Sequence, residues 1–368
     1  MSSKENSRTG LKHAQNIVVK VGSRLLRSEG SADRFDAIAS QVAALCQEGK
    51  RVTLVSSGAI ALGYPLLGLK TRPHQMAMLQ ASAAAGQPKL MQAYELAFSK
   101  HHCMTAQVLL TRTGLLARER YLNARAALEA LLERGVIPIV NENDTVSVEE
   151  ITFGDNDSLA ATVAALVGAD LLILLTGVEG LMDNHNQRVP IVNEVNDVLH
   201  FVTTETSDTG IGGMSSKLLA AQAAAKHGVP VVIANGHQDD ILSCIMQNAD
   251  VGTLILPYGS RRASRKHWIA YTLHPKGCIV VDAGAAKALV ERGSSLLPAG
   301  VVRVEGYFHS GEAVRIVDPA GKELARGLAR YSSEETSQLA GAQSDEIIDR
   351  IGRNDGHEVV HRDDMVVI

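Results

Sequence analysis

Residues 17–23 read Ile-Val-Val-Lys-Val-Gly-Ser, a short β-branched run that ends at a glycine and a serine. A continuous apolar run of this kind is typical of a strand buried on both faces, as in a parallel sheet. Lys20 near its end is either a solvated edge residue or a cation held for a ligand, and Gly22 lets the backbone approach an anion closely. The stretch predicts a buried strand whose carboxyl end faces a ligand.

Short apolar runs, which predict strands, alternate with Ala-rich periodic stretches, which predict helices, through the following 235 or so residues. Such alternation indicates βαβ units and therefore an α/β fold with a mainly parallel sheet. Aromatic residues are only 4% of the chain, and the apolar runs consist of Ala, Val, Leu and Ile, as in helices packed on such a sheet. We expect strands at 17–21, 51–57, 106–110, 136–140, 170–175, 229–235 and 252–257, and helices near 35–48, 75–99, 122–134, 159–167 and 217–227.

The composition changes after residue 258, where a basic, irregular stretch predicts a linker. Beyond it, short strands alternate with Gly and Pro turns, with one helix near 285–291, and this pattern predicts a small β-rich barrel. The first residues are polar and predict a flexible end. The expected organisation is a flexible N-terminus over 1–16, an α/β domain over 17–258, a linker over 259–272 and a β-rich domain over 273–368.

Charge and cysteine spacing exclude several classes of protein. The formal net charge is −4, so no bulk cationic field attracts nucleic acid or an anionic membrane. The four cysteines lie far apart, which indicates neither a disulfide framework nor a structural zinc site. No signal-like core and no apolar run of about 18 residues is present. We expect a cytoplasmic protein, not a membrane one, that acts on a small molecule.

Two further strand ends and one helix start carry polar groups. Residues 54–63 run from a strand through two serines and a glycine into a helix, 138–145 run from a strand into amides and carboxylates, and 154–158 place two carboxylates and an amide at a helix start. Strand carboxyl ends and helix N-termini bind ligands in α/β sheets. Read singly, each is also compatible with an ordinary cap or an Asn- and Asp-rich turn.

The stretch 209–217, Thr-Gly-Ile-Gly-Gly-Met-Ser-Ser-Lys, is a glycine-rich loop that leads to a lysine at a helix start. It lacks the Walker A spacing, but its exposed N–H groups can cradle phosphate oxygens while Lys217 supplies a point charge. A surface loop without a ligand is the alternative.

Taken together, these motifs resemble the amino-acid kinase family, and the C-terminal region looks like a PUA domain. The resemblance spans nearly the whole chain and implies an αβα sandwich with a mainly parallel sheet, followed by a small β-rich PUA-like barrel. The stretches that carry it are 19–23, 55–63, 80–87, 109–114, 118–125, 138–146, 153–161, 174–177 and 212–217 for the kinase part, and 291–301, 306–316, 325–333 and 361–368 for the PUA part.

Within the family, the closest resemblance is to members that use ATP and Mg²⁺ to phosphorylate the side-chain carboxylate of L-glutamate, the first step of proline biosynthesis. A carboxylate is already ionised at pH 7 and needs no general base, so catalysis would rest on cations and aimed N–H groups. The alternatives are family members acting on aspartate, N-acetylglutamate, carbamate or a nucleoside monophosphate, and an RNA-binding role of the PUA-like domain. Residues 271–368 hold 11 Lys and Arg against 15 Asp and Glu, which disfavours RNA.

The resemblance implies residue roles. Lys20, Lys217 and Asp157 would be catalytic, and no metal ligand is assigned. Family members usually carry Asp at the position of Gly177 and Thr at that of Ile211, which leaves nucleotide preference open. Glutamate would be held by Ser57, Asp144 and Asn156, and the nucleotide by Lys20, Thr176, Gly177, Ile211, Gly212, Gly213, Met214, Ser215, Ser216 and Lys217.

The resemblance also suggests partners. These are a homo-oligomer, either dimer or tetramer, proline as a feedback inhibitor, and a downstream glutamyl-phosphate reductase. The residues themselves leave open the oligomeric state, the sensitivity to proline and the contribution of the PUA-like domain.

Overall fold

A computed structural model describes residues 8–23, 25–26, 31–146, 156–202, 213–258, 275–353 and 356–368. The backbone divides into two compact units, Met1–Gly259 and Ser260–Ile368. The linker expected over 259–272 lies outside the described residues. Among the helices of the described part of the chain, none has the length and apolar character needed to cross a membrane.

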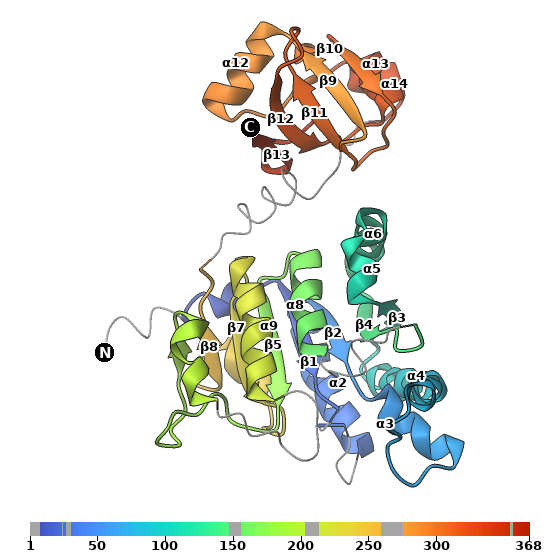
Figure 1. Ribbon diagram of the computed structural model, residues 1–368, viewed down its shortest axis with the longest axis vertical. Coiled ribbons are helices and arrows are strands. Elements are labelled where there is room, and N and C mark those ends of the chain that lie inside the picture. The colour runs from blue at the N-terminus through green and yellow to red at the C-terminus, as the bar shows by residue number, and fades with distance from the viewer. Residues whose placement is uncertain are drawn as a thin grey trace. The chain divides into compact units, whose positions relative to one another are not determined.

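An eight-stranded sheet forms the centre of the first unit (Figure 1). Its strand order is β3-β4-β2-β1-β5-β7-β8-β6, and only the β7/β8 pair is antiparallel, so the predicted α/β fold with a mainly parallel sheet is confirmed. The strands are β1 (Asn16–Val21), β2 (Arg51–Ser56), β3 (Thr105–Leu110), β4 (Ile137–Glu142), β5 (Leu171–Thr176), β6 (Ile191–Val192), β7 (Val231–Asn235) and β8 (Thr253–Ile255).

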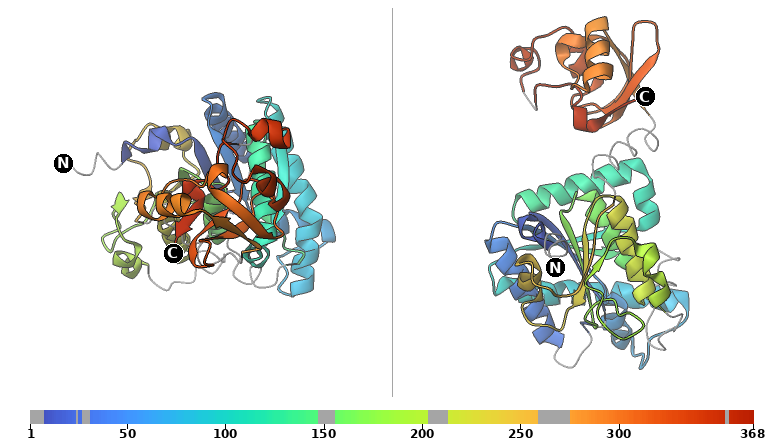
Figure 2. Two further views of the ribbon diagram at one scale, coloured as in Figure 1. Left: turned by 90° about the horizontal axis from the view of Figure 1, so that it is seen from above. Right: turned by 90° about the vertical axis from the view of Figure 1, so that its left-hand side faces the viewer.

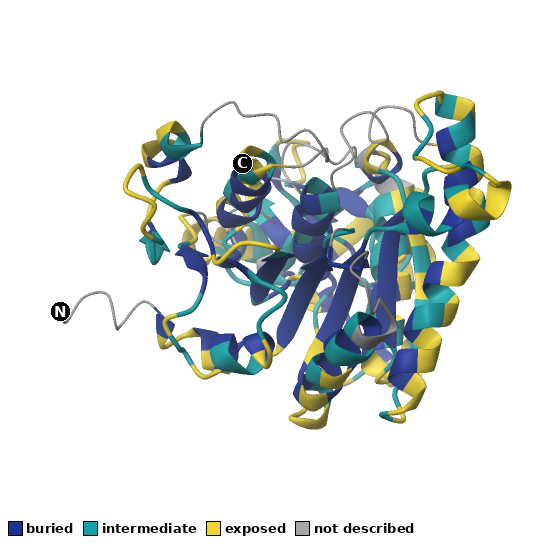
Figure 3. Cartoon of the chain, turned by 90° about the horizontal axis from the view of Figure 1, so that it is seen from below, coloured by how far each residue is buried: buried dark blue, intermediate teal, exposed yellow. Residues whose placement is uncertain are grey.

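Helices cover both faces of this sheet, and in Figure 2 (right) the blue α2 and the yellow-green α9 lie on opposite sides of the strands. The central strands are buried throughout, whereas the outer helices expose one side (Figure 3). The helices are α2 (Ser31–Gln47), α3 (Ala59–Gly63), α4 (Met76–Ser99), α5 (Arg112–Leu116), α6 (Arg118–Glu133), α8 (Asn156–Leu166), α9 (Met214–Lys226) and α10 (Ile241–Met246), with short 3-10 turns at Leu11–His13, Tyr64–Leu67, Val195–Asp197 and Leu199–Phe201.

Strand β1 shows how the sequence directs its lysine. Ile17, Val19 and Val21 belong to one hydrophobic core, which also holds residues of α2, α4 and α10. Val18 belongs to the second core, which holds residues of α8 and α9. Because successive side chains of a strand point to opposite faces, Lys20 shares the face of Val18 and points toward α8 and α9.

Helices α3 and α4 cross at very short range. A Cβ on Gly63 would lie 1.7 Å from the Ser82 carbonyl oxygen, and one on Gly86 would lie 1.8 Å from the Ala59 carbonyl oxygen. Only glycine therefore fits at either position. Gly58, with φ of 117°, makes the turn from β2 into α3 in a conformation that L side chains rarely adopt. The close crossing fixes the turn that follows β2.

The second unit holds a five-stranded sheet in the order β10-β9-β11-β12-β13, in which only the β9/β11 pair is parallel. Its core gathers Ile279, Val281, Leu289, Phe308 and Ile316, among others. The elements are β9 (Gly277–Val281), α12 (Ala283–Arg292), β10 (Val301–Gly306), β11 (Ala313–Val317), β12 (Glu323–Leu328), α13 (Ser333–Leu339), α14 (Ile347–Ile351) and β13 (Met365–Val367), with 3-10 turns at Pro298–Gly300 and Arg362–Asp364.

Candidate active site

A buried carboxylate joins two lysines at the carboxyl edge of the large sheet. Asp157 Oδ1 lies 2.5 Å from Lys20 Nζ, and Asp157 Oδ2 lies 2.8 Å from Lys217 Nζ. Ser216 Oγ also donates to Asp157 Oδ2, at 3.4 Å. The Asp157 side chain is fully buried and the two lysine side chains are 6% and 9% exposed. Two cations from segments far apart in the sequence are thus held beside one another.

The burial of these charges needs compensation. An isolated charge in a protein interior is strongly disfavoured, and here one anion is shared by two cations, so the group carries a net charge of +1. Asp157 and Lys217 lie in the first turns of α8 and α9. Helix N-termini favour anions, so they stabilise Asp157 and leave the edge as a whole attractive to a further anion.

Helix α8 begins earlier than the expected helix near 159–167, at Asn156, so that Asp157 stands inside its first turn. The Asp157 carboxylate contacts the two lysines from this position inside the helix. Asp155, the other carboxylate of the 154–158 stretch, lies outside the described residues.

An amide network fixes the other side of this edge. Asn156 Nδ2 donates to the Ser56 carbonyl oxygen at 2.5 Å and to Asn141 Oδ1 at 2.8 Å. Asn141 Nδ2 in turn donates to Gln87 Oε1 at 2.8 Å. These bonds tie the ends of β2 and β4 to α8 and α4. Since both N–H groups of the Asn156 amide are used within the protein, the group that Asn156 offers to a ligand is its carbonyl oxygen.

Tyr94 supports the end of β2 from beneath. Its hydroxyl lies 2.8 Å from Ser56 Oγ, and both residues are buried. Burial raises the pKa of Tyr94 well above its usual range, against a smaller lowering by the Ser56 hydrogen bond, so the phenol stays neutral. The next residue, Ser57, is half-buried at the turn into α3.

The residues predicted to contact the nucleotide lie at the end of β1, at the end of β5 and around the N-terminus of α9. A Cβ on Gly22 would lie 3.7 Å from the Leu175 carbonyl oxygen and 3.9 Å from Lys20 Nζ, so the loop after β1 runs beside the end of β5, which leads to Thr176 and Gly177. Gly213 precedes α9, which contains Met214, Ser215, Ser216 and Lys217. Ile211 and Gly212 lie outside the described residues.

Asp144 follows β4 in a turn that the Val146 N–H closes by donating to the Asn143 carbonyl oxygen. It is half-buried, like Asn156. β2 and β4 are neighbours in the sheet, so Asp144 and Ser57 follow the ends of adjacent strands. Because α8 brings Asn156 to the same strand ends, the three predicted glutamate-binding residues stand at one edge.

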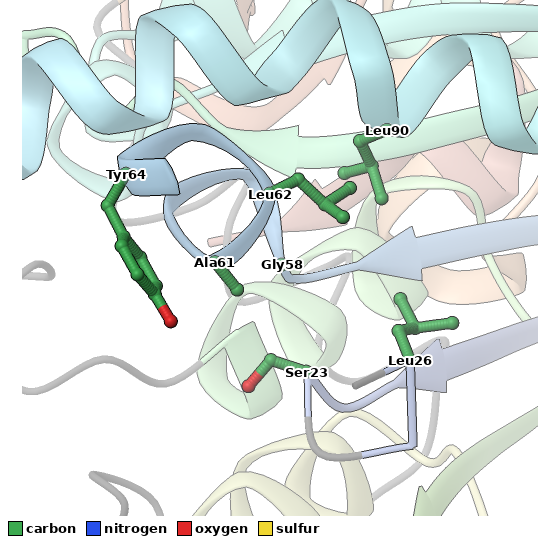
Figure 4. A pocket seen from close by; sticks show the side chains of 7 residues that line it. All are labelled: Ser23, Leu26, Gly58, Ala61, Leu62, Tyr64 and Leu90. Carbon is green, nitrogen blue, oxygen red and sulfur yellow. The ribbon is translucent and has the colours of Figure 1, made fainter. Parts of the chain in front are cut away.

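A cavity of about 300 Å³ opens beside these loops (Figure 4). Its lining contains neither of the two lysines and no carboxylate. The lining residues come from the loop after β1, from α3 with the residues that flank it, and from α4: Ser23, Leu26, Gly58, Ala61, Leu62, Tyr64 and Leu90.

Sequence reasoning missed the supporting residues of the site. Gln87, Asn141 and Ser56 lay within stretches that carried the family resemblance but received no role, and Tyr94 gave no signal at all. Their contacts join elements far apart in sequence, so local patterns could not reveal them. Across the part of the chain that the structure describes, no three His, Cys, Asp or Glu side chains cluster as metal ligands.

Comparison with known proteins matches two stretches of the chain to known families. Residues 15–235 match the amino acid kinase family and residues 277–351 match the PUA domain. The chain is 46% identical to the glutamate 5-kinase of Trichlorobacter lovleyi, over 97% of this chain and 98% of that protein. It is also 46% identical to the glutamate 5-kinase of Methylococcus capsulatus, over 98% of this chain and 99% of that protein.

The fold also occurs in solved structures. One of them is the N-acetylglutamate synthase of Neisseria gonorrhoeae complexed with coenzyme A and N-acetylglutamate, with a TM-score of 0.51 at 19% identity, over 69% of this chain and 63% of that one. At this identity the likeness concerns the fold alone. On the full-length matches, the chain belongs to the glutamate 5-kinases of the amino acid kinase family.

Proposed function

We infer that this chain is a kinase that transfers the terminal phosphoryl group of ATP to the side-chain carboxylate of L-glutamate, the first step of proline biosynthesis. The observation that carries the inference is the buried Asp157, which holds Lys20 and Lys217 together at the carboxyl edge of the sheet. Relatives named glutamate 5-kinase match the chain over nearly its whole length. The product is γ-glutamyl phosphate, with ADP as the leaving group.

The reaction brings an anion against a polyanion. The γ-carboxylate is ionised at pH 7, so it attacks the γ-phosphorus directly, and the bond from that phosphorus to the bridging oxygen of ADP breaks. The chain's task is to offset the repulsion and the charge that develops on the leaving ADP. We propose that Lys20 and Lys217, positioned in advance by Asp157, perform this task without reorganising during the reaction.

We propose that the acceptor lies between the ends of β2 and β4. Asn156 can present only its carbonyl oxygen there, because its N–H groups bond Ser56 and Asn141, so it suits the α-ammonium group of glutamate. Asp144 adds a carboxylate for the same ammonium group. Ser57 follows β2 and supplies a hydroxyl for the glutamate carboxylates.

We propose that the phosphates of ATP lie over Gly22 and the N-terminus of α9. Gly22 has no side chain to obstruct them, and the residues before α9 offer backbone N–H groups. Thr176 and Gly177, after β5, contact the rest of the nucleotide, and residues 211–217 complete the loop.

We propose that Mg²⁺ arrives with ATP, held by phosphate oxygens and water, where it neutralises phosphate charge. The donor set agrees, because the Asp157 oxygens already contact lysines and the described residues present no cluster of three metal-ligating side chains.

We further propose a cytoplasmic homo-oligomer, dimer or tetramer, that proline inhibits and that supplies its product to a glutamyl-phosphate reductase. The acyl phosphate is labile, which favours its immediate use by such a reductase.

The test is a hydroxylamine trap for the acyl phosphate. With ATP and Mg²⁺, we expect a hydroxamate from L-glutamate and little from aspartate or N-acetylglutamate. Equal product from either of those acceptors would overturn the assignment to glutamate. Salt-sensitive retention of RNA by the full chain would support an additional role for the second unit.

A further inference from the structure

His237 lies just beyond β7, at the edge of the sheet where β5 ends. β5 and β7 are parallel neighbours, with Thr176 opposite Asn235. The Gly236 N–H donates to the Thr176 carbonyl oxygen at 2.8 Å, so the two strand ends remain joined beyond the last paired residues. His237 therefore emerges beside Gly177.

Gly177 leaves a space that the imidazole faces. A Cβ built on Gly177 would lie 3.9 Å from His237 Nε2, and apart from its chain neighbours it would meet no other described heavy atom within 4 Å. Gly177 is not among the glycines with positive φ, so the backbone does not demand glycine here. The lack of a side chain at position 177 therefore leaves open space next to His237, whereas the backbone turn itself does not require glycine.

The loop that carries His237 is held without a ligand. The His237 N–H donates to Asn235 Oδ1 at 2.9 Å, and Asn235 Nδ2 donates to Glu179 Oε1 at 2.7 Å. This pair of bonds links the segment after β7 to the segment after β5. A side chain on a loop fixed in this way loses little freedom when a ligand binds, which favours affinity.

The strand order indicates which part of a nucleotide reaches His237. β5 separates β1 from β7, so the end of β7 lies about 10 Å from the end of β1, at about 4.8 Å per strand. Phosphates bound at Lys20 would place the nucleoside about that far along the edge, over the ends of β5 and β7.

We propose that His237 binds the nucleoside half of ATP, in the space that Gly177 leaves open. This proposal rests on the proposed kinase function, because it takes the phosphate position from Lys20 and Lys217. The imidazole can exchange a hydrogen bond with a ribose hydroxyl or lie against the purine ring. His237 then determines nucleotide affinity, while glutamate binding stays with the ends of β2 and β4.

The first experiment replaces the ring. We expect His237→Ala to raise the KM for ATP and the Kd for ADP, measured by calorimetry, about tenfold, while the KM for glutamate stays within twofold. The matched control is His227→Ala, an exposed histidine that caps the C-terminus of α9 before β7 begins. This variant should behave like the wild type in all three measurements.

The second experiment fills the space instead. Gly177→Leu should raise the KM for ATP as His237→Ala does, and should do so even if the histidine variant folds poorly. If both variants keep the wild-type KM for ATP and Kd for ADP, or if the KM for glutamate rises equally, His237 does not bind the nucleoside. If His237→Asn keeps the nucleotide affinity that His237→Ala loses, His237 makes a hydrogen bond to the ribose. If His237→Phe keeps that affinity instead, His237 contacts the base.

These measurements also separate this inference from the proposed function. Loss of ADP binding in His237→Ala supports the nucleoside site even if the wild type makes no hydroxamate from glutamate. Hydroxamate formed at an unchanged KM for ATP in both variants would instead support the kinase activity and refute the nucleoside site.

Discussion

The main contribution of Asp157 is to position Lys20 and Lys217 and not to stabilise the fold. Replacing a buried ion group by apolar side chains often costs a protein nothing, so its retention points to a role for the two lysines that it holds. The Lys217 Nζ has three donors, and the bond to Asp157 uses one of them. The carboxylate is thus a fixed counter-ion that aims two cations at one place.

Removing either lysine tests this view. Lys20→Ala and Lys217→Ala should each lower turnover by at least about 10²–10³-fold, the usual loss for a group that stabilises developing charge. Hydroxamate assays would measure the rate, and circular dichroism would establish that the fold persists. Lys226→Ala, an exposed site at the far end of α9, is the control. Wild-type rates in either active-site variant would refute a phosphate role for that lysine.

Asp144 permits a separate test of the acceptor side. Asp144→Ala should raise the KM for glutamate by about 10-fold or more, because the α-ammonium group loses a carboxylate partner, and should leave the KM for ATP nearly unchanged. Asp36→Ala, which removes a surface ion pair between α2 and Lys100, is the control and should alter neither constant. Unchanged glutamate dependence in Asp144→Ala would place the ammonium group elsewhere.

At the scale of the elements, the crossing of α3 and α4 depends on two glycines. Gly63→Ala or Gly86→Ala would drive a methyl group into backbone at under 2 Å, so the helices must separate. We expect a loss of about 3 kcal/mol or more in the free energy of unfolding, measured in urea, or a failure to fold. Gly10→Ala, where a Cβ meets no atom within 4 Å, should be nearly neutral. Equal stability of all three variants would contradict the close crossing.

Helix α13 of the second unit depends on a capping box. Ser332 accepts from the Glu335 N–H, and Glu335 accepts from the Ser332 N–H and from Arg353. Burial pushes the pKa of Glu335 up, but these bonds outweigh it and lower the pKa below its ordinary value. Ser332→Ala should cost about 1 kcal/mol.

The lowered pKa of Glu335 also fixes a pH dependence. A carboxyl whose folded pKa is depressed stabilises the fold fully above its ordinary pKa of 4.5 and loses that contribution as pH falls through the lowered value. Chemical denaturation between pH 7 and pH 3 should therefore show the wild type losing more stability than Glu335→Gln. Parallel loss in both proteins would exclude a contribution from Glu335.

The strong periodic elements were predictable from sequence, and the weak ones were not. The strands β1, β2, β4, β5 and β7 are built mainly from buried apolar residues, because helices cover both faces of the sheet. β6 has two residues, which is too short for a periodic signal, whereas the five-residue α3 was expected from the turn that follows β2. β12, Glu323–Leu328, holds two charged residues and a glycine but no β-branched residue, so its sequence carries no clear strand signal. In the candidate site, Lys20 and Lys217 were predicted from their motifs, whereas the network through Gln87, Asn141 and Tyr94 required the fold.

For the whole molecule, the hydrophobic clusters divide the chain as the backbone does. In the described residues, two clusters cover the faces of the large sheet, a third fills the second unit, and no residue of the third comes from the first unit. Each unit therefore has the means to unfold by its own transition. All the residues assigned to the proposed active site belong to the first unit, so we expect ligand binding to stabilise that unit.

Scanning calorimetry of the full chain tests this coupling. We expect two thermal transitions. ADP at 100 times its Kd should raise the free energy of unfolding for one of them by about 2.7 kcal/mol, because ligands that bind only the folded state stabilise it by mass action. Lys217→Ala should abolish that shift and Ser332→Ala should lower only the other transition, so the two variants assign the transitions to their units. A single transition, or an equal shift of both by ADP, would mean that the units unfold together and that the second unit senses the nucleotide bound to the first.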